Sequence, residues 1–147
     1  LPQEPKFVDG TFLDNLIGLQ KIEREKMNSI LKRVDLENFV NSDPQGIQMS
    51  LLNRGEDLPF GIRKRMALAR ALIVDGQIVL LDEPTETLDQ RGKDAIYSII
   101  AQFIKSNKTV VISTLDKEIL EKANYIIDLD SKPNPKIIKN NIKYNYK

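Results

Sequence analysis

The clearest pattern in the chain is an amphipathic segment followed directly by a short apolar run. From Arg63 to Ile73, apolar residues recur at roughly helical spacing, with Lys64 and Arg70 among the polar positions, which predicts an amphipathic helix. The pair Asp75-Gly76 interrupts this pattern. The run Ile78–Leu81 that follows is typical of a strand buried on both faces of a parallel sheet. We therefore expect a helix that leads into a core strand.

The rest of the chain continues this alternation of helical and extended patterns. Helices are predicted at Phe12–Leu19, Lys21–Val34, Leu36–Val40, Gly92–Lys105 and about Lys117–Ala123, and further strands at Thr109–Thr114 and Tyr125–Leu129. Alternating strands and helices favour an α/β fold with a parallel sheet, here preceded by a helical subdomain.

Composition narrows the chemistry that the chain can perform. Its 147 residues are about one domain, with 41% hydrophobic and 29% charged residues and a net charge of +1. The near-neutral charge does not favour nucleic acid as a partner. Cysteine and histidine are absent, which excludes disulfides, thiol nucleophiles and histidine acid–base chemistry. Since no run of about 18 apolar residues and no secretion signal occurs, we expect this chain itself to be soluble.

Two adjacent acids follow the predicted core strand. Asp82 and Glu83 come where Ile78–Leu81 ends, and ligands of open parallel sheets bind beyond the carboxyl ends of the strands. One carboxylate can hold Mg²⁺ and the other can orient or deprotonate an attacking water. This arrangement suits a nucleoside triphosphatase.

The sequence around these acids resembles ATP-binding cassette (ABC) ATPases. The stretch Leu81-Asp82-Glu83-Pro84-Thr85, followed by Leu88-Asp89, is similar to their Walker B motif and D-loop, and Ala67–Leu72 is similar to the helix after their signature motif. The resemblance implies a partial P-loop NTPase fold that binds ATP and Mg²⁺. It assigns Mg²⁺ to Asp82, the catalytic base to Glu83, and a contact across a dimer interface to Asp89.

The resemblance also divides the chain. Residues 1–10 resemble the Q-loop, whose glutamine, here Gln3, reaches Mg²⁺. Residues 11–73 then form the helical subdomain with the signature helix, and residues 74–130 carry Walker B, the D-loop and the switch loop. Residues 131–147 form a polar tail. The loop Ser50–Gly55 is either a structural loop or an element that contacts a transmembrane domain.

Two loops depart from the family pattern. The signature position, normally LSGGQ, reads Leu58-Pro59-Phe60-Gly61-Ile62, and proline supplies neither a hydroxyl nor an amide hydrogen to a phosphate. The switch position, normally a histidine, is Leu115, which cannot donate a hydrogen bond. We expect this chain to complete a partner's ATP site poorly.

The phosphate-binding half of the cassette is missing from these 147 residues. No GxxxxGK[ST] motif occurs, and in the family the strand before that loop lies between the strands expected at Thr109–Thr114 and Tyr125–Leu129. Without it, two buried ladders lose their partner, so the chain should fold loosely, rearrange or pair with another chain.

The leading hypothesis is the C-terminal part of the ATP-binding domain of an ABC transporter, whose ATP hydrolysis drives export, of a peptide or toxin in a type I secretion-like system. Its partners would be a second nucleotide-binding domain and a transmembrane domain at the cytoplasmic face of a membrane. The alternative is a degenerate cassette that does not hydrolyse ATP and acts as a regulatory or dimerisation half. Because the chain lacks a Walker A loop, we expect it to be inactive in isolation.

Overall fold

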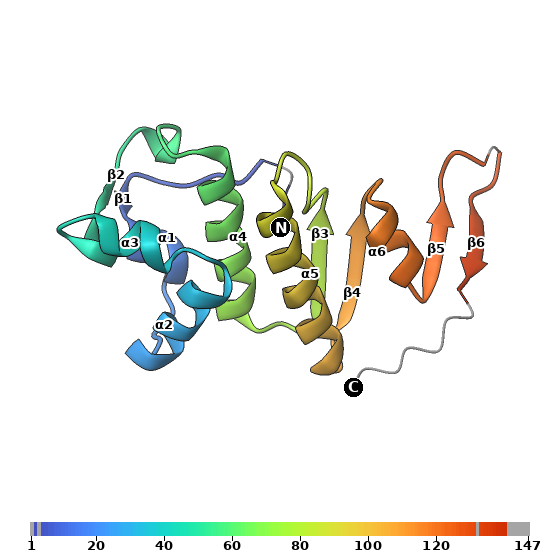
Figure 1. Cartoon of the computed structure of the whole chain (residues 1–147), viewed down its shortest axis with the longest axis horizontal. Helices are drawn as coiled ribbons and strands as arrows, with labels where there is room; N and C mark the ends of the chain where they lie inside the picture. Colours follow the sequence, from blue (N-terminus) through green and yellow to red (C-terminus); the bar gives the residue numbers. More distant parts are fainter. Residues whose placement is uncertain (1, 3, 132, 141–147) are drawn as a thin grey trace. The chain divides into compact units, whose positions relative to one another are not determined.

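The structure is a computed structural model that describes residues 2, 4–131 and 133–140. The chain divides into two compact units, Leu1–Ser113 and Thr114–Lys147. The first unit contains, in order, β1 (Gly10–Thr11), α1 (Phe12–Ile17), α2 (Arg24–Arg33), α3 (Glu37–Ser42), η1 (Gly46–Gln48), β2 (Ser50–Leu51), η2 (Asn53–Gly55), α4 (Phe60–Val74), β3 (Ile78–Asp82), α5 (Gln90–Lys105) and β4 (Thr109–Ser113) (Figure 1).

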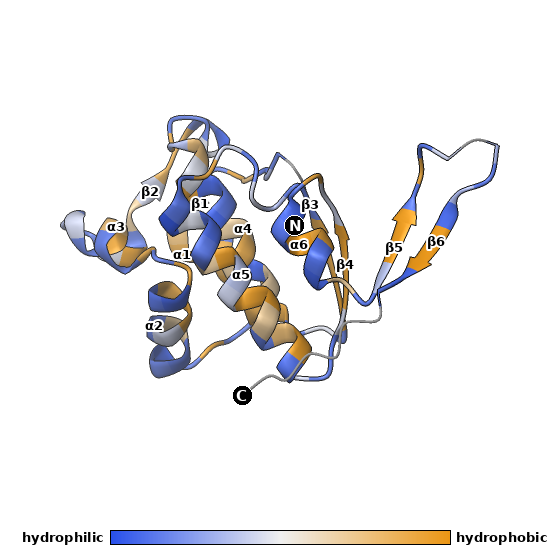
Figure 2. Ribbon diagram, turned by 45° about the vertical axis from the view of Figure 1, so that its right-hand side comes forward, coloured by the Kyte–Doolittle hydropathy of each residue, from blue (hydrophilic) through white to orange (hydrophobic). Residues whose placement is uncertain are grey.

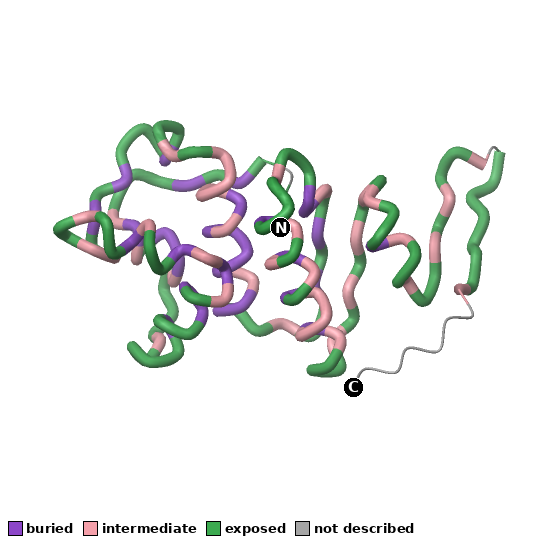
Figure 3. The backbone as a smooth tube through the Cα atoms, in the orientation of Figure 1, coloured by how far each residue is buried: buried purple, intermediate pink, exposed green. Residues whose placement is uncertain are grey.

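Helix α4 is the centre of the first unit. Its buried residues face the short helices α1 and α2, and Figure 3 shows purple, buried backbone concentrated along it. The core that forms around it is mostly aliphatic, with Phe12, Ile30, Leu36, Met66 and Leu68 almost completely buried. The helix expected over residues 63–73 is confirmed and begins three residues earlier, but Lys64, expected on its polar face, is buried.

Polar contacts join residues 6–8 to α1 and α4. The Arg70 guanidinium lies 4.5 Å from the centre of the Phe7 ring and donates to the Lys6 carbonyl at 2.9 Å and to the Asn15 carbonyl. Buried Asn15 in turn accepts from the Val8 amide at 3.0 Å and donates to the Val8 carbonyl at 2.9 Å. Arg70, expected on the polar face, is therefore a packing residue.

The first unit has two small sheets: β1 pairs with β2 in an antiparallel manner, and β3 pairs with β4 in a parallel manner. Residues Ile78 to Asp82 pair with Thr109 to Ser113 in register, so both strands end at the same edge. The prediction that Ile78–Leu81 is buried on both faces is wrong: Val79 and Leu81 are buried, but Ile78 and Leu80 are 66% and 62% exposed. Val111 of β4 is likewise exposed. The described helices therefore cover one face of this sheet and leave its apolar second face in contact with solvent.

The second unit consists of α6 (Lys117–Lys122) and an antiparallel hairpin of β5 (Tyr125–Asp128) and β6 (Lys136–Lys139). The expected strand at Tyr125–Leu129 is confirmed, but β6 was not predicted, because its two isoleucines stand among lysines and asparagines in the stretch expected to be a tail. Figure 2 shows apolar residues along both strands, where Tyr125, Ile127, Ile137 and Ile138 are exposed. Asn140 ties the hairpin to α6 by donating to the Leu120 carbonyl at 3.2 Å.

A lysine joins the end of α4 to the start of β4. Asp75 ends α4 in the left-handed conformation, with φ of 56°. The Lys108 ammonium donates to the Asp75 carboxylate at 2.8 Å and to the carbonyls of Asp75 and Gly76 at 3.0 and 2.7 Å. This hydrogen bond holds the pKa of Asp75 below its usual range, and the charge of Lys108 acts in the same direction.

We expect Asp75→Asn to remove acid sensitivity with little loss of stability. Because the folded pKa lies below the unfolded one, the carboxylate stabilises the fold above pH about 4 and this contribution disappears as pH falls through the folded pKa. The Asp75 side chain is 65% exposed, so solvent screens its charge, and the loss at pH 7 should be at most about 1 kcal/mol. Asparagine tolerates the left-handed conformation. Urea unfolding at pH 7 and pH 3 should show the two proteins converging at low pH; a constant difference would contradict the assignment.

Candidate functional site

The two acids lie at the shared carboxyl edge of β3 and β4. Asp82 is the last residue of β3, pairs with Ser113 and is exposed. The Glu83 amide donates to the Ser113 carbonyl at 2.9 Å, which extends the ladder by one bond. Glu83 has φ of 39°, unusual for a residue with a side chain, and the next residues, Pro84 and Thr85, are buried. The structure therefore holds the backbone of both acids at the edge where a ligand can approach.

The segment after the acids is a sequence of tight turns that ends in a helix cap. The Glu86 amide bonds the Glu83 carbonyl and the Leu88 amide bonds the Thr85 carbonyl, both at 3.3 Å. Asp89 then caps α5, since its carboxylate accepts from the Gly92 amide at 2.8 Å. A Cβ atom at position 92 would lie 3.0 Å from this carboxylate and 3.2 Å from Leu88 Cβ, so a larger residue there would require its neighbours to shift by a few tenths of an ångström.

Lys64 supports this segment from inside the protein. Its side chain is fully buried, and its ammonium donates to the carbonyls of Glu83 at 2.7 Å and Glu86 at 3.0 Å. It also lies 5.1 Å from the centre of the Phe60 ring, close enough for a cation–π interaction. Burial lowers the pKa of Lys64, and the charges of Glu86, Glu83 and Asp82 partly oppose this shift. One side chain thus connects the start of α4 to the loop that carries the acids.

Sequence reasoning placed Lys64 on the polar face and missed this role. The pattern did contain a signal, because Lys64, Leu68 and Leu72 are spaced four residues apart and share the buried face of α4. A lysine that continues an apolar series points to a buried partner. Here the partners are two backbone carbonyls.

The signature position forms the first turn of α4. Pro59 caps the helix without a side-chain hydrogen bond, and its carbonyl accepts from the Ile62 and Arg63 amides at 2.9 and 3.1 Å. The Phe60 ring lies against the Arg63 guanidinium, 5.4 Å away, as well as against Lys64. A side chain added at Gly61 would meet no atom within 4 Å, so this glycine lies on open surface.

Two expected site residues cannot be placed beside the acids. Gln3 lies outside the described residues. Leu115 belongs to the second unit, where its side chain is 87% exposed, two residues before the start of α6. The first unit therefore carries Asp82, Glu83 and Asp89 on one continuous segment, and Lys64 joins the start of this segment to the signature turn, but the structure does not assemble the whole candidate set.

The residues at this edge are compatible with Mg²⁺. Asp82 offers an exposed carboxylate, and Mg²⁺ in phosphate-transfer sites is bound by one or two carboxylates together with the phosphates. Within the described residues, no three acids, histidines or cysteines lie close enough together to form a metal site. In the same part of the chain, no helix is long and apolar enough to cross a membrane.

Comparisons with known proteins place this geometry in a family context. A family model described as ABC transporter matches residues 1–86. The chain is 32% identical over 133 residues to the "ABC-type transmembrane transporter verA" of Clonostachys rogersoniana, covering 88% of this chain and 10% of that protein. It is 34% identical over 132 residues to the "Glutathione/L-cysteine transport system ATP-binding/permease protein CydC" of Escherichia coli K12, covering 89% of this chain and 22% of that protein.

A solved structure gives the same result. The chain is similar to a bacterial Atm1-family ABC exporter with ATP bound, with a TM-score of 0.77 and 25% identity, over 86% of this chain and 22% of that one. The chain thus spans about a tenth to a quarter of the length of these known proteins.

We expect Lys64→Met to destabilise the fold by about 1–3 kcal/mol, because the carbonyls of Glu83 and Glu86 lose their buried donor. The difference should depend on pH. Since the pKa of Lys64 is lowered on folding, the wild type should gain stability relative to Lys64→Met as pH rises toward the unfolded value of about 10.4.

Urea unfolding at pH 7 and pH 9.5 measures both effects. Lys32→Met, at an exposed position on α2, is the control and should change stability by less than about 0.5 kcal/mol. If both variants behaved alike, the support of residues 83–86 by Lys64 would be refuted.

Proposed function

The chain belongs to the ABC transporter family, and from this premise we propose that it forms the C-terminal part of the ATP-binding domain of an exporter. This proposal rests on the position of Asp82 and Glu83 at the carboxyl edge of the β3–β4 sheet. The loop that begins at Glu83 accepts hydrogen bonds from the buried Lys64 ammonium. Carboxylates at such an edge can serve phosphate chemistry.

The proposed chemistry is hydrolysis of the γ-phosphate of ATP. Mg²⁺, held by Asp82 and by Gln3, would neutralise charge on the phosphates. Glu83 would accept a hydrogen bond from the attacking water and orient it. The turns that follow Glu83, and the donation of Lys64 to its carbonyl, keep the backbone of this residue in one conformation.

The exposed sheet face supports the view that another part of the cassette packs here. Ile78, Leu80 and Val111 present apolar side chains to solvent, and burial of each would stabilise the assembly by about 1.5–3 kcal/mol. We propose that a segment carrying the phosphate-binding loop covers this face. The peptide backbone of that loop would supply the phosphate contacts that this sequence lacks.

The partners follow from the family. Asp89 and the signature turn, Leu58–Ile62, would face a second nucleotide-binding domain, and a transmembrane domain would carry the exported molecule through the membrane, with this domain on the cytoplasmic face. The proposed cargo is a peptide or toxin, as in type I secretion. Because Pro59 has no amide hydrogen and the Phe60 ring lies near Arg63 and Lys64, the contribution of this chain to a partner's site would be weak.

The altered signature turn also favours a second candidate, a degenerate cassette that regulates or dimerises without hydrolysing ATP. Phe60 fills the space where a glycine would allow a phosphate to approach, and Leu115 offers no hydrogen bond. Retention of Glu83 favours the active cassette, since a site without hydrolysis does not require this carboxylate.

Substitution of the proposed base separates the two candidates. In the parent exporter, Glu83→Gln should lower the ATPase kcat by about 100-fold or more, since loss of general-base assistance has effects of this size. Glu37→Gln, an exposed acid on α3, is the matched control and should retain the wild-type rate. A rate for Glu83→Gln that equals the wild type would favour the degenerate cassette.

Restoring the missing donors tests the two degenerate loops. Pro59→Ser with Phe60→Gly, and separately Leu115→His, should each raise the ATPase rate of the parent exporter by about tenfold or more, because each adds a donor for a phosphate oxygen. Leu129→His, at another exposed leucine of the second unit, controls for a histidine added elsewhere. Equal rates in all variants would show that these positions do not contact the nucleotide.

A further inference from the structure

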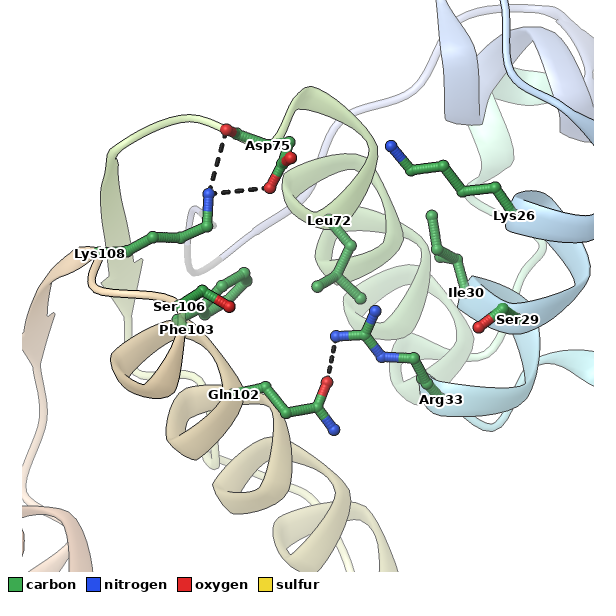
Figure 4. Close-up of a pocket in the computed structure, with 10 residues that line it drawn as sticks. All are labelled: Lys26, Ser29, Ile30, Arg33, Leu72, Asp75, Gln102, Phe103, Ser106 and Lys108. Atoms are coloured by element: carbon green, nitrogen blue, oxygen red, sulfur yellow. Dashed lines mark hydrogen bonds and ion pairs between the residues drawn. The ribbon is translucent and has the colours of Figure 1, made fainter. Parts of the chain in front are cut away.

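A pocket with an excess of positive charge lies in the first unit, away from the acids. It is formed by α2, by the ends of α4 and α5, and by the residues just before β4, and has a volume of about 240 Å³ (Figure 4). Asp75 precedes β3 and Lys108 precedes β4, whereas Asp82 ends β3. Since five residues of extended strand span about 13 Å from first to last, the pocket and the acids lie at opposite ends of the sheet.

Three cations and one acid line this pocket. Figure 4 shows Lys108 directed at Asp75, with which it forms an ion pair of 2.8 Å. Lys26 and Arg33 therefore have no acid within the pocket to neutralise them. Lys26 is exposed and forms no hydrogen bond or ion pair with any described residue. Two positive charges are left for a ligand.

The contacts of Arg33 leave part of its hydrogen-bonding capacity unused. One terminal nitrogen donates to the side-chain oxygen of Gln102, which is neutral. The Nε atom is buried and has no acceptor among the described residues. A buried donor without an acceptor is costly, and an anion that enters the pocket can supply one.

The charges act across the pocket. The pKa of Asp75 is lowered first by its hydrogen bond with Lys108, and the charges of Lys26 and Arg33 contribute in the same direction. Their field therefore extends to the opposite wall of the pocket.

Helix ends alone do not explain these cations. Positive side chains often neutralise the carbonyls at the end of a helix, and Lys108 does so at the end of α4. Neither Lys26 nor Arg33 donates to a backbone carbonyl in the part of the chain that the structure describes. Ser29 and Ser106 add hydroxyl donors to the same pocket.

We propose that this pocket binds the phosphate group of a small phosphorylated molecule, with Lys26 and Arg33 supplying the charge and Ser29 and Ser106 supplying hydroxyl donors. Ammonium, guanidinium and hydroxyl groups together are the donors that phosphate oxygens require. The volume lies below the range of about 300–1,000 Å³ typical of drug-sized ligands, so a phosphate with a small substituent fits and a nucleotide does not.

Titration of the full chain with inorganic phosphate, followed by amide NMR shifts at constant ionic strength, tests the proposal. Saturable shifts are expected at the residues of α2 and at the end of α5. Lys26→Gln combined with Arg33→Gln should weaken the dissociation constant at least about tenfold. Lys32→Gln, which removes a neighbouring exposed cation on α2 outside the pocket, should change it by less than about twofold.

Two further measurements keep the result interpretable. Ser29→Ala with Ser106→Ala removes the hydroxyls without changing charge and should also weaken binding, which guards against a misfolded charge variant. Glycerol phosphate in place of phosphate identifies the source: tighter binding indicates a phosphorylated metabolite and equal binding indicates free phosphate. Absence of saturable shifts, or equal weakening by Lys32→Gln, would overturn the proposal and leave these cations as solvated surface charges.

Discussion

Burial of α4 is the constraint on which the rest of the first unit depends. The helix packs its apolar side chains against α1 and α2, and its polar side chains reach backbone on three sides. Arg70 binds the first residues of the chain, Arg65 forms an ion pair of 3.3 Å with Asp35 at the end of α2, and Lys64 donates to the carbonyls around the acidic loop. Displacement of α4 would therefore disturb the hydrophobic core and the candidate site together.

The buried ammonium of Lys64 supplies hydrogen bonds to backbone carbonyls in the loop after β3. The backbone after β3 turns sharply at Glu83, and the carbonyls of Glu83 and Glu86 are directed at the buried ammonium of Lys64. A buried polar group of this kind needs a partner. Lys64 supplies one from the second turn of α4, so the geometry of the acids depends on a residue next to the signature position.

The exposed apolar face of the β3–β4 sheet and the exposed β5–β6 hairpin share one physical feature. A parallel sheet is ordinarily covered on both faces, and an isolated hairpin is marginally stable in water. In the described part of the chain, β3 pairs only with β4, and β5 only with β6. Both features leave apolar side chains uncovered within the described residues.

The sequence by itself determined the order and type of most elements and the family, because helical periodicity, apolar strand runs and the Asp82-Glu83 motif are local patterns. It located the acids after the core strand and the signature position before the helix. Only the tertiary structure decided which faces are buried: Lys64 proved to be internal, Ile78 and Leu80 external, and β6 a strand. These outcomes depend on partners far along the chain, and local periodicity contains no information about them.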